Sequence, residues 1–181
     1  MEKTDKHLVV DFYKTAVKGD KLDTFLAKYA QKDDKFYDAG GSRALSAIMK
    51  ARETGDHKVV GELETAVKDL FFDGINGLHD HAKSRGYDVS VYSNGHPGFI
   101  KEAFKIKGMD VGTLDPNEVG SKKQAASYDK VCKKLGTSKD KIVYVTDSTA
   151  EVKAATDAGL TKVALFNPSA PSYARTKSYI R

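Results

Sequence analysis

Three short apolar runs in this chain each end at a polar side chain. HLVV stops at Asp11, VSVY stops at Ser93, and the almost continuously apolar IVYVT stops at Asp147. A strand that is apolar on both faces is typical of the interior of a parallel sheet. The sequence therefore predicts parallel strands whose carboxyl ends carry polar groups.

Segments with helical periodicity separate these strands. Pro97 lies in a first-turn position, and Gly86, Gly108 and Gly136 each follow a helical pattern. Such alternation predicts a doubly wound, mainly parallel α/β sheet of Rossmann type. The predicted strands are residues 7–10, 87–94, 141–147 and 161–167, and the predicted helices are residues 74–86, 97–108, 122–136 and 149–159.

One long segment breaks the alternation. Residues 16–69 hold no convincing strand, but DKLDTFLAKYAQ and SRALSAIMKARETG space their apolar residues as helices do. We therefore expect a small helical insertion at 16–69 and an α/β core made of residues 1–15 and 70–181.

Length and composition fit one compact domain with an insertion. Of the 181 residues 40% are hydrophobic, and no apolar run approaches the roughly 20 residues that span a bilayer. The apolar stretch after MEKTDK is too short for a signal peptide, and Cys132 is the only cysteine, so we expect a cytoplasmic protein. The net charge of +5 is spread without a basic block. We expect a small anionic substrate rather than nucleic acid or a membrane, and a monomer or homodimer.

The polar strand ends predict a site for an anionic group. Ligands of open α/β sheets bind at the carboxyl ends of the strands, near the point where the strand order reverses. Asp11, Ser93 and Asp147 would meet there, and Lys122 would join them from the predicted start of a helix. A carboxylate can act as nucleophile, a hydroxyl and an ammonium can hold oxyanions, and a second carboxylate can bring Mg²⁺.

The order of these motifs resembles the haloacid dehalogenase superfamily: Asp-x-[acid or Tyr]-x-Thr, a strand with Ser-Asn, a lysine, and a strand with Asp. That superfamily inserts a helical cap where residues 16–69 lie. The C-terminal half is most similar to the enolase-phosphatase branch of methionine salvage, which has Gly-x-Lys-x-x-x-x-Ser-Tyr and Thr-Asp-x-Thr-x-Glu. The matching residues are Gly120, Lys122, Ser127, Tyr128, Thr146, Asp147, Thr149 and Glu151.

The resemblance implies a catalytic set. Asp11 would be the nucleophile, and Thr15, the last residue of the same motif, would also belong to the catalytic residues. Ser93 would bind the transferring group, and Lys122 would neutralise that group and the nucleophile.

The same resemblance implies a Mg²⁺ site. Asp11 and the carbonyl of Tyr13 would be protein ligands. Asp147 would bind the ion directly or through water, and Glu151 would support it.

The first motif departs from the phosphatase pattern at Tyr13 and Lys14. Phosphatases of the superfamily carry Asp or Glu at the position of Tyr13, where the acid protonates the leaving group and activates water, followed by Gly. A phenol with a pKa of about 10 replaces that acid poorly. Asp-x-Tyr-x-Thr and SNG at 93–95 resemble the 2-haloacid dehalogenases, in which aspartate displaces halide without a metal. Those enzymes keep no Asp at the place of Asp147.

Four further residues are candidate substrate contacts. Asn94, Gly95 and His96 follow Ser93 at the edge of the expected crevice. Arg43 lies in the insertion, and arginine grips carboxylates and phosphates through two parallel hydrogen bonds.

Three functions stay open at this level. The first is a Mg²⁺-dependent phosphohydrolase that forms an aspartyl-phosphate on a small phosphorylated metabolite, slowed by Tyr13. The second is a metal-independent 2-haloacid dehalogenase. The third is a catalytically retired member that binds a ligand.

Overall fold

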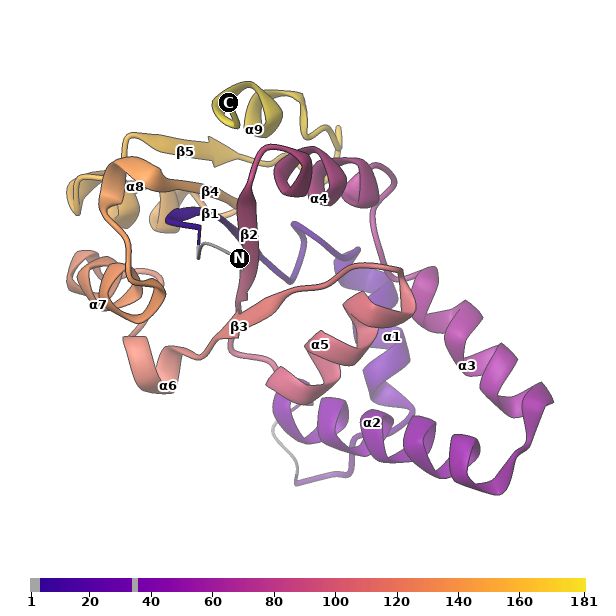
Figure 1. The fold of residues 1–181 in the computed structure, drawn as a ribbon. Helices are drawn as coiled ribbons and strands as arrows, with labels where there is room; N and C mark the ends of the chain where they lie inside the picture. The colour runs from indigo at the N-terminus through magenta and orange to yellow at the C-terminus, as the bar shows by residue number, and fades with distance from the viewer. Residues whose placement is uncertain (1–3, 34–35) are drawn as a thin grey trace.

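The computed structural model describes residues 4–33 and 36–181. Five parallel strands form a sheet in the order β3-β2-β1-β4-β5, with β1 at its centre (Figure 1). The strands are β1 (Lys6–Asp11), β2 (Tyr87–Tyr92), β3 (Gly112–Leu114), β4 (Ile142–Thr146) and β5 (Lys162–Leu165). The predicted parallel α/β fold is confirmed.

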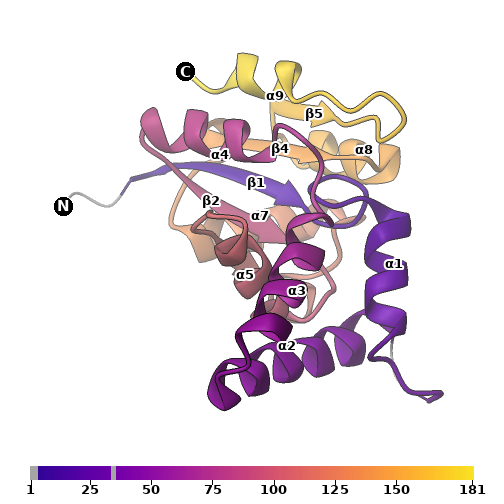
Figure 2. The same ribbon diagram turned by 90° about the vertical axis from the view of Figure 1, so that its right-hand side faces the viewer.

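Helices cover both faces of the sheet. They are α1 (Gly19–Ala27), α2 (Phe36–Thr54), α3 (His57–Lys68), α4 (Ile75–Ser84), α5 (Pro97–Ile106), α6 (Pro116–Val119), α7 (Ala125–Leu135), α8 (Thr149–Asp157) and α9 (Ala174–Tyr179), with a 3₁₀ turn at Lys139–Lys141. Leu8 and Val10 of β1 belong to one apolar cluster with α4, α5 and α9, and Val9 belongs to a second cluster with α6, α7 and α8. This division follows from the alternation of side chains along a strand. Figure 2 shows α4 and α9 together on one side of β1. None of the helices that the structure describes has the length and apolar character needed to cross a membrane.

The strand order brings distant polar residues to one edge. The chain builds β2 and β3 on one side of β1 and then crosses to build β4 and β5 on the other. Asp11 ends β1, Ser93 follows β2, and Asp147 follows β4. All three therefore lie at the carboxyl edge, at the reversal of strand order where such folds bind ligands.

The helices α1, α2 and α3 stand beside this edge and pack against α5 (Figure 1). The chain enters and leaves them through neighbouring segments. The Lys18 amide donates to the Leu70 carbonyl at 2.8 Å, and the Phe72 amide donates to the Ala16 carbonyl at 3.0 Å. The boundaries of the helical insertion, predicted at 15/16 and 69/70, stay a prediction. The two hydrogen bonds between the entering and leaving segments are consistent with them.

Some elements differ from the sequence prediction. The helix predicted from residue 122 begins at Ala125, because Gln124 before it is extended, with φ −116° and ψ 126°. Lys122 therefore lies in a loop rather than in a helix. The prediction missed β3, α6 and α9, which are three, four and six residues long, too short to display a period.

The second apolar cluster contains three tyrosines in mutual contact. Tyr92, Tyr128 and Tyr144 are each at most 1% exposed. The ring centroids of Tyr92 and Tyr128 are 6.2 Å apart, and those of Tyr128 and Tyr144 are 5.7 Å apart. Burial raises the pKa of Tyr92 to about 12 and also raises the pKa values of Tyr128 and Tyr144.

These pKa values predict a loss of stability at alkaline pH. The folded chain holds the three phenolic protons above the pH of about 10 at which an unfolded chain releases them. Below about pH 10 these groups should make the free energy of unfolding neither rise nor fall with pH. As the pH rises toward 12, the free energy of unfolding should decrease. In a titration followed by tyrosinate absorbance, we expect these tyrosines to ionise together with a cooperative loss of circular dichroism. Smooth ionisation of all nine tyrosines in a chain that stays folded would contradict this, and the urea-unfolded chain is the control.

The turn after β1 contains an unfavourable backbone conformation. Of the non-glycine residues that the structure describes, only Lys14 has a positive φ, at 62°. The left-handed region costs an L-residue about 1–2 kcal/mol, whereas glycine enters it freely. A cation–π interaction offsets a little of this cost, because the Nζ of the exposed Lys14 lies 5.2 Å from the centre of the Tyr13 ring.

We therefore expect Lys14→Gly to raise the free energy of unfolding by about 0.5–1 kcal/mol. Denaturant unfolding measures this change. The matched control is Lys28→Gly, because Lys28 has an ordinary helical φ of −67° and the same change there should destabilise the chain. Equal destabilisation by both substitutions would contradict the prediction.

Candidate active site

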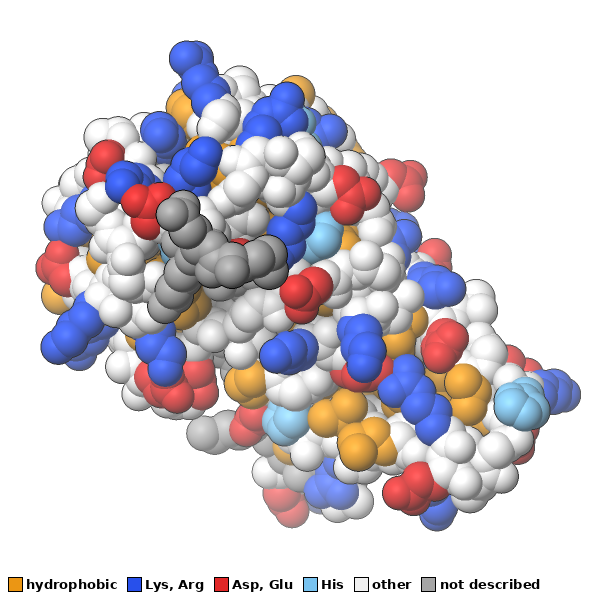
Figure 3. Space-filling view, in the orientation of Figure 1, with side chains coloured by type: hydrophobic (Ala, Val, Ile, Leu, Met, Phe, Trp, Pro, Cys, Tyr) orange, Lys and Arg blue, Asp and Glu red, His pale blue; other side chains and the backbone are white. Residues whose placement is uncertain are grey.

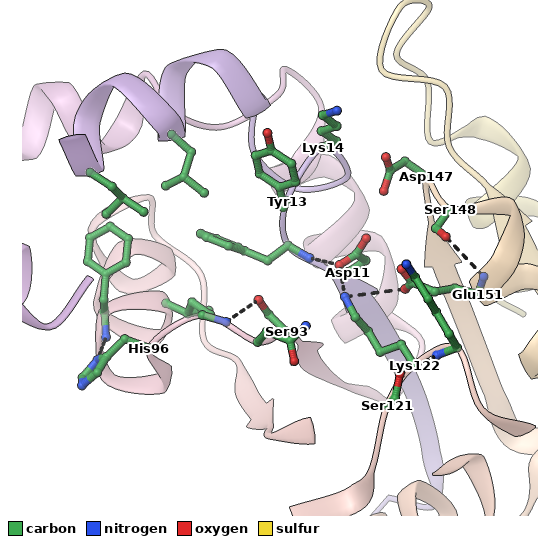
Figure 4. A pocket seen from close by; sticks show the side chains of 18 residues that line it. Asp11, Tyr13, Lys14, Ser93, His96, Ser121, Lys122, Asp147, Ser148 and Glu151 are labelled. Carbon is green, nitrogen blue, oxygen red and sulfur yellow. Dashed lines mark hydrogen bonds and ion pairs between the residues drawn. The ribbon is translucent and has the colours of Figure 1, made fainter. Parts of the chain in front are cut away.

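A pocket of about 460 Å³ opens at the carboxyl edge of the sheet (Figure 4). Its walls come from β1, the turns after β2 and β4, the loop before α7, and helices α1 and α5. The residues predicted from sequence that line it are Asp11, Tyr13, Ser93, Asn94, Gly95, His96, Lys122, Asp147 and Glu151.

Asp11 is the most buried acid of the pocket, at 3% exposed. Its Oδ1 accepts a hydrogen bond from the Lys122 ammonium at 2.6 Å and one from the Phe12 amide at 2.8 Å. Its Oδ2 lies 3.3 Å from the Thr15 hydroxyl and 3.2 Å from the Thr146 hydroxyl. The carboxylate is therefore held in one orientation from every side.

Two threonine hydroxyls are each shared by two carboxylates. Thr15 Oγ1 lies 3.3 Å from an oxygen of Asp11 and 3.3 Å from one of Asp147. Thr146 Oγ1 lies 3.2 Å from Asp11 and 3.1 Å from Glu151. A hydroxyl has one hydrogen to donate, so neither threonine can satisfy both of its acids. Thr15 itself does not line the pocket but joins its acids from behind.

The buried cluster carries excess negative charge. Asp11, Asp147 and Glu151 supply three carboxylates, and Lys122 supplies one ammonium, so the ionised set carries a charge of minus two. Burial raises the pKa of Asp11, the Asp147 charge raises it further, and Lys122 opposes the shift. A divalent cation at this point would balance the charge.

The donor set suits a hard cation. Asp11 and Asp147 face the same Thr15 hydroxyl, and Ser148 rather than Asp147 caps α8, since Ser148 Oγ accepts from the Glu151 amide at 3.3 Å. Asp147 is therefore not used as a helix cap. Mg²⁺ in proteins commonly takes one or two carboxylates and completes its shell with water. Among the described residues no three His, Cys, Asp or Glu side chains form a metal cluster, so an ion held by Asp11 and Asp147 would take the rest of its ligands from water and backbone oxygens.

The carboxylate of Glu151 is held by other side chains of the site. It accepts from the Tyr144 hydroxyl at 2.7 Å and from Thr146, and it lies 3.6 Å from the Lys122 ammonium. Glu151 is thus a partner of Lys122 in this structure, and its support of a metal ion stays a prediction. A sequence pattern does not show this ion pair, because Lys122 comes from a different segment of the chain.

Tyr13 turns toward helix α1. Its hydroxyl donates to Oδ2 of Asp23 at 3.0 Å, and Figure 4 shows the ring pointing away from Asp11. The position that the resemblance reserves for an acid therefore carries a link between the turn after β1 and the first inserted helix.

The turn after β2 is held by its own side chains. Ser93 Oγ accepts from the Gly95 amide at 3.0 Å, which leaves its hydrogen for a ligand. His96 caps α5, because its Nδ1 accepts from the Phe99 amide at 3.1 Å. Asn94 is exposed at the rim.

Arg43 does not reach this pocket. It lies exposed on α2, where it lines a shallow surface depression with Ala39, Ser42 and Ser46. The structure therefore does not bring Arg43 together with the other predicted site residues.

The sequence prediction missed an apolar wall. One side of the pocket is formed by the side chains of Phe12, Leu22, Leu26, Phe99 and Ile100. Leu22 and Leu26 are four residues apart on α1, a spacing that also describes ordinary core packing. Both leucines are in fact part of the buried core, at 1% exposed, so the sequence offers no signal that they also line a pocket.

Curated relatives give a first comparison. The chain is 32% identical over 92 residues to the enolase-phosphatase E1 of Salmo salar, which covers 48% of this chain and 35% of that protein. It is 31% identical over 84 residues to the enolase-phosphatase E1 of Aquifex aeolicus, which covers 43% of this chain and 37% of that protein. These matches span well under two thirds of either relative.

A solved structure has the same fold at low identity. The L-2-haloacid dehalogenase of Xanthobacter autotrophicus superposes with a TM-score of 0.56 at 15% identity, covering 90% of this chain and 78% of that chain. The model of the haloacid dehalogenase-like hydrolase family matches residues 6–159. Because this match spans most of the sequence and includes all three strand-end motifs, the chain belongs to the haloacid dehalogenase-like hydrolases.

Proposed function

We propose that this hydrolase is a Mg²⁺-dependent phosphohydrolase of a small phosphorylated metabolite. The observation that carries the proposal is the buried charge of minus two around Asp11 and Asp147. Without a cation, that charge repels an anionic substrate. With Mg²⁺ bound by Asp11, Asp147 and the Tyr13 carbonyl, an anionic nucleophile can approach an anionic phosphate.

The residues of the pocket divide the reaction between them. A carboxylate oxygen of Asp11 attacks phosphorus, the bond to the leaving oxygen breaks, and an aspartyl-phosphate remains. Lys122 and the Ser93 hydroxyl hold the oxygens of the transferring group. Water then attacks the phosphorus of the aspartyl-phosphate, which releases phosphate and restores the Asp11 carboxylate.

The pocket also favours a particular shape of substrate. The apolar wall of Phe12, Leu22, Leu26, Phe99 and Ile100 faces the acids and suits an apolar body rather than a polyol. The exposed ammonium groups of Lys14 and Lys123 stand at the rim and attract anions. The similarity to proteins named enolase-phosphatase supports a phosphorylated substrate.

The first test uses Asp11→Asn with p-nitrophenyl phosphate, an aryl phosphate with a good leaving group. Asparagine keeps the shape of the side chain but cannot form the acyl-phosphate, so hydrolysis should fall to background. EDTA should suppress the wild-type rate, and added Mg²⁺ should restore it. Asp20→Asn, an exposed acid on α1, is the control and should keep full activity. Full turnover in EDTA would overturn the proposal.

The second test uses Tyr13→Asp. A general acid contributes about 10²–10⁴-fold to such reactions, and the substitution returns a carboxyl group to that position. We expect kcat for an alkyl phosphate to rise at least about tenfold, since an alkoxide leaving group needs the proton. Tyr13→Asn is the matched control, because it also breaks the bond to Asp23 but supplies no acid. An equal effect of the two variants would contradict an acid role.

A metal-independent 2-haloacid dehalogenase is the second candidate. The observation that favours it is Tyr13, which brings no acid to the pocket, together with a Lys122 ammonium already paired to Asp11. Release of halide from 2-chloropropionate in EDTA, abolished by Asp11→Asn, would select this function. Absence of both activities would leave a ligand-binding member of the family.

A further inference from the structure

The loop that carries Lys122 has little regular structure of its own. It lies between α6 and α7, and it bends at Gly120, where φ is 96°. A Cβ at Gly120 would lie 2.4 Å from the Ser127 hydroxyl oxygen, so the loop is pressed against α7. The position of the Lys122 ammonium therefore depends on what holds this loop from outside.

Two buried tyrosine hydroxyls hold its backbone. Tyr92 at the end of β2 donates to the Gly120 carbonyl, and Tyr128 on α7 donates to the Lys122 carbonyl, the latter at 2.6 Å. Both rings are essentially fully buried. Phenylalanine would fill the same space in the core, so the hydroxyls serve the loop rather than the packing.

A third tyrosine acts on the other side of the lysine. Tyr144 on β4 donates to Glu151 at 2.7 Å, and Glu151 lies 3.6 Å from the Lys122 ammonium. The Lys122 side chain is 12% exposed and points at Asp11. The Lys122 backbone is thus held by Tyr128, and Tyr92 holds the same loop at Gly120. The ammonium is held by two carboxylates, one of which is bound by Tyr144.

We propose that Tyr92, Tyr128 and Tyr144, the tyrosine cluster, are positioning residues that set the Lys122 ammonium against Asp11. They do not line the pocket. They act through the loop, through Glu151 and, for Tyr92, through a ring whose centre lies 6.0 Å from the Lys122 ammonium. The proposal rests on the proposed function only in the choice of substrate for its kinetic test. The tyrosines of the second apolar cluster would thus position a side chain of the site in addition to packing the core.

The kinetic test compares Tyr128→Phe with Tyr87→Phe, using p-nitrophenyl phosphate. Tyr87 is a matched control, because it is a buried tyrosine at the opposite end of the same strand as Tyr92. We expect Tyr128→Phe to lower kcat about tenfold, equivalent to about 1.4 kcal/mol, without changing the Mg²⁺ concentration that gives half-maximal activity. Tyr87→Phe should change neither value.

A double-mutant cycle separates positioning from general destabilisation. If Tyr128 acts through Lys122, then Tyr128→Phe should lower kcat in the wild type and cause no further loss in Lys122→Met. Crystal structures of the wild type and of Tyr128→Phe give a readout that needs no activity: the distance of 2.6 Å between the Lys122 ammonium and Asp11 should lengthen in the variant. It therefore decides the proposal even if the wild type hydrolyses no phosphate.

Two results would overturn the proposal. The first is a Tyr128→Phe variant whose kcat equals that of the control variant Tyr87→Phe. The second is a structure of Tyr128→Phe in which the Lys122 ammonium keeps its place beside Asp11. If Lys122→Met does not fold, Lys122→Arg takes its place in the cycle, because it keeps the charge and changes its position.

Discussion

The ion pair of Lys122 and Asp11 is the contact on which the rest of the site depends. The ammonium lies 2.6 Å from a carboxylate that is almost fully buried. A buried carboxylate without a partner would protonate, and burial here does raise the pKa of Asp11. Lys122 opposes that shift and keeps available the anionic form that a nucleophile needs.

One ammonium does not balance three acids. Asp147 and Glu151 share threonine hydroxyls with Asp11, so the cluster keeps a net negative charge that further hydrogen bonds cannot remove. This imbalance is the physical basis for proposing Mg²⁺. Glu151, 3.6 Å from the Lys122 ammonium, takes a second share of its charge.

Helix α1 contributes to the site differently from the strands. The strand ends supply charge, whereas α1 supplies Leu22 and Leu26 and accepts the Tyr13 hydroxyl hydrogen bond at Asp23. On the face of the molecule drawn in Figure 3, Lys and Arg side chains are interspersed with Asp and Glu side chains. Tyr13 therefore connects the insertion to the turn after β1, at the position where an acid would otherwise act.

The sequence by itself determined the parallel sheet and the residues at its carboxyl edge. Apolar runs that end at Asp11, Ser93 and Asp147 give this result because strand burial and strand ends are local properties of the chain. Only the tertiary structure decided that Lys122 stands in a loop, that Glu151 faces it, that Arg43 lies elsewhere, and that apolar side chains of α1 and α5 form the opposite wall. These facts depend on which separate segments of the chain come together in the fold, and a local pattern carries no information on such contacts.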